Sequence, residues 1–227
     1  MAQSVLVIAD SGSGKSTAIR DLNPKETFII NIANKPLPFK GWKKNYSMIS
    51  KDNPKGNMTP VSSAAGITKA MMHVNDKMPH IKNLVIDDWQ YMSSFEYFDR
   101  ADEKGYDKFT SIAKNLAQVA KLPKDMREDL YIFFLTHSEE STDVNGHRKV
   151  KAKTVGKMID NALTLEGLFS IVLFGKVVKG EDDKLSYVFE TVNNGENTCK
   201  SPDKMFDSAR IENSLAVVKD AIIQYEN

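Results

Sequence analysis

Short aliphatic runs alternate with segments of helical periodicity along most of the chain. Four of these runs have the length of a strand and are almost continuously apolar, which is typical of strands buried on both faces of a parallel sheet. They cover residues 4–9, 27–33, 82–88 and 131–136. The pattern therefore predicts four buried strands spread over the first 136 residues.

Apolar residues at helical spacing predict helices between and after these strands. The first two cover residues 15–22 and 62–76; the third has the stripe Phe109, Ile112, Ala113, Leu116, Ala117 and Ala120, and the last has Ile211, Leu215, Val218, Ile222 and Tyr225. Residues 169–178 and 185–192 flank a polar turn and predict an antiparallel hairpin. Residues 34–60 contain four prolines and have weak periodicity, so we expect a long loop there.

The order of these elements favours one fold class. Strands that alternate with helices predict an α/β fold with a mostly parallel, doubly wound sheet, to which the late hairpin adds antiparallel strands. No repeat, linker or low-complexity tract interrupts residues 1–227, so we expect a single domain.

Composition narrows the classes of partner. Lys and Arg total 31 against 30 Asp and Glu, so a nucleic acid must be met by a local patch rather than by overall charge. The single cysteine, Cys199, excludes an internal disulfide and fits a reducing compartment. The sequence shows neither a signal peptide nor an apolar run long enough for a membrane span, so we expect a cytoplasmic protein.

A glycine-rich segment follows the first predicted strand and opens the first predicted helix. It contains Ser11, Gly12, Ser13, Gly14, Lys15, Ser16 and Thr17. In the pattern G-x-x-x-x-G-K-[ST], backbone N–H groups surround phosphates at a helix N-terminus, the lysine reaches the terminal phosphates, and the hydroxyl binds Mg²⁺. Here Ala9 replaces the first glycine. The segment predicts an ATP and magnesium site with Lys15 as a catalytic cation; the alternative is an ordinary Gly/Ser turn.

Two carboxylates end the third predicted strand. Asp87 is expected to hold Mg²⁺ together with Ser16, and Asp88 to orient the attacking water, because side chains alternate along a strand and Asp88 should face the other way. The alternative for both acids is that they merely cap the strand. His137 follows the fourth predicted strand, where a polar group can sense the γ-phosphate, although a structural histidine would also fit.

Two segments hold lysine and arginine without any acid. Residues 144–159 contain Arg148, Lys149, Lys151, Lys153 and Lys157. Residues 27–51 contain Lys35, Lys40, Lys43, Lys44 and Lys51, interleaved with Phe39, Trp42 and Tyr46. Cations and aromatic rings in a loop suit single-stranded nucleic acid. There are two alternatives for the cations of either segment. They could reach a neighbouring subunit's nucleotide and stabilise charge in the transition state, or they could belong to an ordinary solvated loop.

Several motifs together resemble the phage-encoded RecA-like ATPases, in particular the small Sak-type single-strand annealing recombinases. The motifs are residues 11–17, 35–41, 85–88, 135–137 and 153–157, and the late hairpin followed by residues 198–202. The resemblance implies a RecA-like P-loop core and homo-oligomers with nucleotide at subunit boundaries. It also implies a role in phage DNA recombination or replication, which would place the protein in the host cytoplasm.

One departure from the family pattern keeps other functions open. RecA-type enzymes commonly carry a catalytic glutamate just after the second strand, where this chain has Asn31 and Asn34. Either Asp88 takes that role or hydrolysis is slow. The leading interpretation is an ATP-dependent DNA recombination or annealing factor. A nucleotide-gated adaptor with little turnover, such as a helicase loader or packaging accessory, is the alternative. A small-molecule kinase has less support. Such kinases usually cover the phosphates with an arginine-rich lid, and Arg148 is the only arginine between Arg127 and Arg210.

Overall fold

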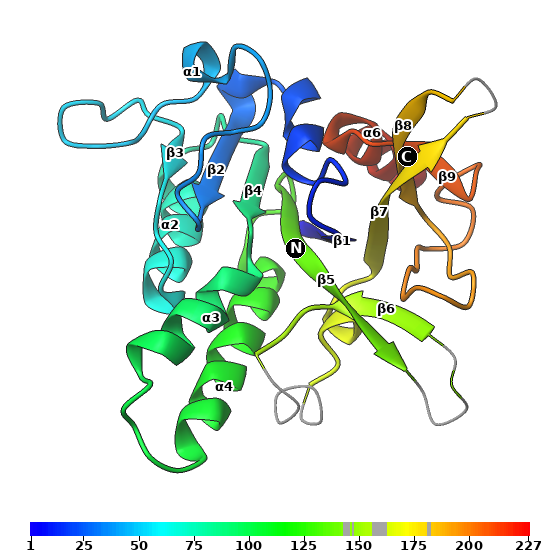
Figure 1. Cartoon of the computed structure of the whole chain (residues 1–227). Helices are drawn as coiled ribbons and strands as arrows, with labels where there is room; N and C mark the ends of the chain where they lie inside the picture. The colour runs from blue at the N-terminus through cyan, green and yellow to red at the C-terminus, as the bar shows by residue number, and fades with distance from the viewer. Residues whose placement is uncertain (143–145, 147, 156–162, 181–182) are drawn as a thin grey trace.

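The chain has an α/β fold with a mixed, mostly parallel sheet (Figure 1). The computed structural model describes residues 1–142, 146, 148–155, 163–180 and 183–227. Its strands are β1 (Gln3–Ala9), β2 (Thr27–Asn31), β3 (Met58–Thr59), β4 (Asn83–Asp87), β5 (Tyr131–Thr142), β6 (Arg148–Ala152), β7 (Ile171–Lys179), β8 (Leu185–Glu190) and β9 (Arg210–Glu212). Its α-helices are α1 (Trp42–Asn45), α2 (Ala64–Lys77), α3 (Gln90–Asp99), α4 (Asp107–Lys121) and α6 (Leu215–Glu226). Its 3₁₀ helices are η1 (Ser16–Asp21), η2 (Pro24–Glu26), η3 (Leu122–Asp125) and η4 (Leu165–Leu168).

The strand order is β3-β2-β4-β5-β1-β7-β8-β9, and β6 pairs with β5. Pairing is parallel from β3 to β7 and antiparallel for the late strands β8 and β9 and for β6. The predicted four parallel strands and late hairpin are therefore confirmed. One strand, β5, separates β1 from β4, so the glycine-rich loop and the two aspartates leave the sheet from strands that are not neighbours.

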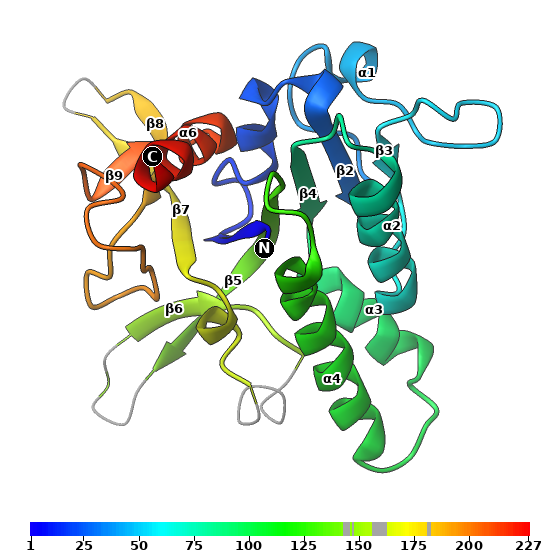
Figure 2. The ribbon, with the colours of Figure 1, turned by 180° about the vertical axis from the view of Figure 1, so that it is seen from behind.

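Both faces of the parallel sheet are covered. Figures 1 and 2 show α2, α3 and α4 together on one side of the strands, and α6 beside η1 away from them. Alternate strand residues such as Leu6 and Ile86 join the first helical layer in one apolar core, and Val7 and Val85 join η1 and α6 in a second core. Among the described residues, no helix is both long enough and apolar enough to cross a membrane.

The structure corrects two of the predicted elements near the N-terminus. The helix expected at residues 15–22 is the six-residue 3₁₀ helix η1, which is short because Asn23 and Pro24 follow it. The loop expected at residues 34–60 contains α1 and the short strand β3, and Leu37 and Tyr46 in it are buried in the second core. A two-residue strand is too short to show any periodicity in the sequence.

Further elements lie where the sequence predicted none or a different end. β5 continues six residues beyond Thr136, and β6 occupies a basic segment that was expected to be a loop. Residues 138–142 are polar because this part of β5 leaves the core as a two-stranded ribbon, so no buried face marks it as a strand. The helix α3 was also not predicted, and Ile211, which was expected in the last helix, lies instead in the three-residue strand β9.

The end of β1 shows how closely the central strands fit. Ala9 lies opposite Gly175 of β7 in the parallel register. A Cβ atom built on Gly175 would lie 2.9 Å from Ala9 Cβ, and neither atom belongs to a side chain that can turn away. The alanine that replaces the first glycine of the loop motif thus fits at position 9, because Gly175, its neighbour on β7, has no side chain.

We predict that Gly175→Ala lowers the free energy of unfolding by about 1–3 kcal/mol, because the added methyl group overpacks the core against Ala9. Urea unfolding measures the loss. Gly167→Ala is the control, since its Cβ would find no described atom closer than Thr164 Cβ at 3.9 Å. Equal stability of the two variants would contradict the close packing of Ala9 and Gly175.

Candidate nucleotide site

The glycine-rich loop forms a tight turn at the end of β1. Gly12 and Gly14 have φ angles of +81° and +87°, in the left-handed region that side chains other than glycine rarely adopt. The Ser13 hydroxyl and backbone N–H both donate to the Asp10 carbonyl oxygen, at 2.7 and 3.3 Å. Because η1 is a single short 3₁₀ helix, the features here that could hold a phosphate are the loop backbone and Lys15, rather than a long helix dipole.

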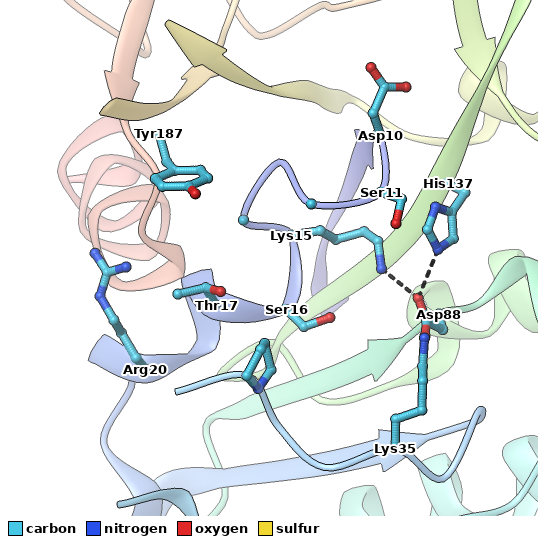
Figure 3. Close-up of a pocket in the computed structure, with 13 residues that line it drawn as sticks. Asp10, Ser11, Lys15, Ser16, Thr17, Arg20, Lys35, Asp88, His137 and Tyr187 are labelled. Carbon is cyan, nitrogen blue, oxygen red and sulfur yellow. Dashed lines mark hydrogen bonds and ion pairs between the residues drawn. The ribbon is translucent and has the colours of Figure 1, made fainter. Parts of the chain in front are cut away.

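A buried ion-pair network joins this loop to the end of β4 (Figure 3). Lys15 is only 6% exposed, and its Nζ lies 2.5 Å from Asp88 Oδ1 and 3.8 Å from Asp87 Oδ1. Lys35 Nζ lies 2.5 Å from Asp88 Oδ2, and His137 Nε2 lies 3.4 Å from Asp88 Oδ1. Both aspartates are buried. The structure therefore brings together the predicted residues Lys15, Asp87, Asp88 and His137.

The expected opposite orientation of Asp87 and Asp88 is wrong. Both carboxylates lie near Lys15 Nζ. The alternation of side chains holds only within an extended strand, and β4 ends at Asp87. Asp88 has a φ of +60°, a left-handed backbone conformation that redirects its side chain to the same site.

Ser16 and Asp87 provide a pair of oxygen atoms suited to magnesium. Ser16 Oγ donates a hydrogen bond to Asp87 Oδ1 over 2.8 Å. Mg²⁺ is usually bound through one or two protein oxygens, with substrate phosphates and water completing its octahedron. Since a hydroxyl and a carboxylate already meet beside Lys15, these residues fit a magnesium–nucleotide complex.

The electrostatic surroundings distinguish the two aspartates. Burial alone would raise the pKa of Asp88, but the hydrogen bond from His137 and the ammonium groups of Lys15 and Lys35 hold it well below the usual aspartate range. Burial, with the nearby Asp88 carboxylate, raises the pKa of Asp87 despite Lys15. Asp88 is thus fully compensated by protein cations, whereas the charge of Asp87 would be stabilised by a further cation.

His137 lies where the parallel sheet gives way to the ribbon, and not beyond a strand end as predicted. It is opposite Ala9 in the last pair of β1 and β5, and the next residue, Ser138, pairs with Ala152 of β6. The backbone N–H of His137 donates to Gln90 Oε1 over 3.1 Å. This bond fixes the backbone at His137, and the imidazole lies beside Asp88 at the edge of the glycine-rich loop.

Lys35 was expected in a basic loop, and the structure places it in the network around Asp88. Two hydrogen bonds with the Asn31 side-chain amide hold the turn that carries Lys35. Asn31 Nδ2 donates to the Lys35 carbonyl oxygen over 2.6 Å, and the Lys35 N–H donates to Asn31 Oδ1 over 3.2 Å. Partial burial would lower the pKa of Lys35, but its hydrogen bond to Asp88 raises it. Asn31 lies opposite Asp87 in the β2–β4 register, so the turn that carries Lys35 lies beside the two aspartates.

The basic segment at residues 144–159 contains the strand β6, and two cations of β6 face acids of β5 across the ribbon. Lys151 Nζ lies 3.1 Å from Glu139 Oε1, and Arg148 Nη1 lies 3.8 Å from Glu140 Oε2. Lys153 lines a small cavity together with Asp10, Ser11 and His137, whereas Lys149 lines another cavity at the far end of the ribbon. Lys157 lies outside the described residues.

The aromatic residues of the first basic segment are turned inward. Tyr46 is 3% exposed, and Phe39 and Trp42 are partly buried against the second core. Phe39 and Tyr46 meet edge to face, with ring centroids 6.2 Å apart. Tyr46 is therefore too buried to stack on a base, contrary to the expectation, whereas Phe39 and Trp42 keep part of their surface exposed.

A cavity of about 510 Å³ lies over the glycine-rich loop, within the size range of nucleotide pockets. Besides the loop it is lined by Arg20, Lys35, Pro38, Asp88, His137 and Tyr187. Arg20 and Tyr187 were not expected here, because neither follows a predicted parallel strand.

No protein-family model matches the chain, and no curated protein matches it. Its chemistry is therefore inferred from its own residues.

We predict that Asp88→Asn lowers the free energy of unfolding by about 3 kcal/mol at pH 7 without magnesium or nucleotide, because it leaves the buried Lys15 ammonium without its nearest opposite charge. The pKa of Asp88 is lowered in the folded state, so its contribution to stability is fully present above the unfolded pKa of about 4 and is lost progressively as the pH falls from there through the folded pKa. The difference between parent and variant should therefore shrink at pH 3, which urea unfolding would measure.

Asp129→Asn is the matched control for this experiment. Asp129 also pairs with two cations, Lys82 and Arg127, but its side chain is 47% exposed, so its loss should cost less than about 1 kcal/mol. If Asp88→Asn were as stable as Asp129→Asn at pH 7, the network around Asp88 would not stabilise the fold.

Proposed function

We propose that this chain is a magnesium-dependent P-loop ATPase with a RecA-like core. The observation that carries the proposal is the 2.8 Å contact between Ser16 Oγ and Asp87 Oδ1, directly beside the loop lysine Lys15. A magnesium-binding hydroxyl, a carboxylate at a buried strand end and a phosphate-binding lysine are the parts that nucleoside triphosphate hydrolysis requires. The separation of β1 and β4 by the single strand β5 agrees with this core.

Each residue then has a defined role. The loop backbone and Lys15 bind the phosphates, and Ser16 and Asp87 hold Mg²⁺. The metal, when bound, neutralises charge on the terminal phosphates. Lys15 and Lys35 now neutralise Asp88, and both can transfer to a γ-phosphate that brings negative charge to the same place. His137 lies within reach of the same phosphate.

Release of the two lysines would leave Asp88 as an acceptor for the attacking water. Lys15, Lys35 and His137 hold the pKa of Asp88 low, so Asp88 is a weak base for as long as these contacts persist. We therefore assign it to orienting the water rather than to taking its proton early in the reaction. Asn31, next to Asp87, is committed to the Lys35 turn and offers no carboxylate. Slow turnover is therefore expected, and this same observation keeps the nucleotide-gated adaptor as the second candidate.

We further propose that ATP binding serves DNA recombination, single-strand annealing or replication, with single-stranded DNA as ligand and a homo-oligomer as the working state. The support is the set of sequence motifs together with the cationic ribbon of β5 and β6, which extends beyond the parallel strands beside His137 (Figure 1). Arg148 is 80% exposed at the ribbon's far end, where phosphates can approach it.

Lys15→Ala should abolish binding of magnesium–ATP, because the phosphates lose their central cation. Calorimetry measures the affinity, and circular dichroism checks that the variant is folded. Lys25→Ala, on the short helix η2 outside the cavity, should bind like the parent. ATP affinity equal to that of the parent in Lys15→Ala would refute the site.

Replacing Arg148, Lys149 and Lys153 together with glutamine should weaken binding of single-stranded DNA. The slope of log affinity against log salt should flatten by about 0.7 for each phosphate that the variant no longer neutralises. Lys124, Lys179 and Lys200, replaced together, are the control. Unchanged DNA affinity in the triple variant would show that the ribbon does not bind DNA. In the same assay, steady-state ATP hydrolysis with and without DNA separates a DNA-dependent ATPase from an adaptor.

A further inference from the structure

The cavity over the glycine-rich loop has two chemically different ends (Figure 3). Asp88, His137 and Lys35 lie at one end, where the ions gather. Tyr187 and Arg20 lie at the other end, beyond Thr17, and they have no part in the phosphate chemistry described above. An aromatic ring and a guanidinium group form a surface that suits a flat, uncharged ring system.

Tyr187 comes from a part of the chain remote from the loop motif, yet it lies directly against the loop. It is on β8, opposite Val177 of β7, and β7 pairs in turn with β1. A Cβ atom on Gly14 would come within 2.9 Å of Tyr187 Cδ1. The Tyr187 side chain is nevertheless 45% exposed and lines the cavity. It is therefore fixed at one edge and open to a ligand.

Arg20 is tied to the same antiparallel strands. Its Nη2 lies 3.5 Å from Glu212 Oε1 and its Nε lies 3.3 Å from Asp21 Oδ2. Glu212 ends β9 and pairs with Val188, the residue after Tyr187. Asn213, which is 1% exposed, packs its amide against Gly14 and has no hydrogen-bond partner for either side-chain atom among the described residues. β8 and β9 thus adjoin the loop and orient both Tyr187 and Arg20.

The position of the metal ligands gives a bound nucleotide its direction. Ser16 and Asp87 mark the terminal phosphates, since magnesium bridges them in P-loop sites. The nucleoside must then leave the loop on the side away from Asp88. In this cavity that side leads past Thr17 to Tyr187 and Arg20.

We propose that the base of a bound nucleoside triphosphate stacks on Tyr187, with Arg20 as the second, cationic wall. This inference rests on the proposed function and adds to it how the nucleoside end is recognised. Stacking uses the face of the base, which every nucleobase has, so it predicts affinity for the base with little discrimination among bases.

Comparison of magnesium–ATP with magnesium tripolyphosphate tests the proposal, because tripolyphosphate has the phosphates and lacks the nucleoside. Tyr187→Leu should lower ATP affinity about tenfold or more and change tripolyphosphate affinity by less than about twofold. Tyr187→Phe, which keeps the ring, should bind ATP like the parent. Tyr106→Leu, an exposed tyrosine at the start of α4, is the control for a surface substitution. Isothermal titration calorimetry measures all affinities.

Two results would overturn the stacking role. Equal losses for ATP and tripolyphosphate in Tyr187→Leu would show that Tyr187 only supports the loop at Gly14. Unchanged ATP affinity in that variant would show that the base lies elsewhere. A parent protein that binds neither ligand would instead contradict the proposed function itself, so the two failures are distinguishable.

Discussion

A lysine buried in a protein interior needs an opposite charge, because the isolated ammonium group would lose its hydration without compensation. In this chain the requirement falls on Lys15 and is met by Asp88 at 2.5 Å. The pair connects the end of β1 to the end of β4 across the intervening β5. The left-handed conformation of Asp88 and the anchoring of Lys35 by Asn31 both serve this contact. The remainder of the site is arranged around it.

This arrangement also explains why two adjacent aspartates are not equivalent. Asp88 accepts contacts from three basic side chains and stays ionised, whereas Asp87 has the Ser16 hydroxyl and a more distant Lys15. The network thus combines two acids, two lysines, a histidine and a hydroxyl, and the proposed magnesium and phosphate sites rest on this combination.

The sequence predicted those features that depend on local pattern. Continuous aliphatic runs marked the four parallel strands, and the loop motif marked Lys15 and Ser16. Features that depend on tertiary contact were missed or misjudged. Lys35 looked like part of a basic loop because its partner, Asp88, is 53 residues away in the chain. Tyr46 looked available to bases because no periodicity revealed that it is buried in the second core.

The contact of Tyr187 and Asn213 with Gly14 has a consequence for dissecting the protein. Every residue that we propose to bind phosphate or magnesium lies in the first 137 residues, so a fragment ending there looks sufficient by inspection. Such a fragment would leave β1 as an edge strand, with the glycine loop unsupported on one side. The smallest unit worth expressing for nucleotide binding therefore extends through β9, and a tag or fusion partner is better attached after α6 than inserted between β7 and β9.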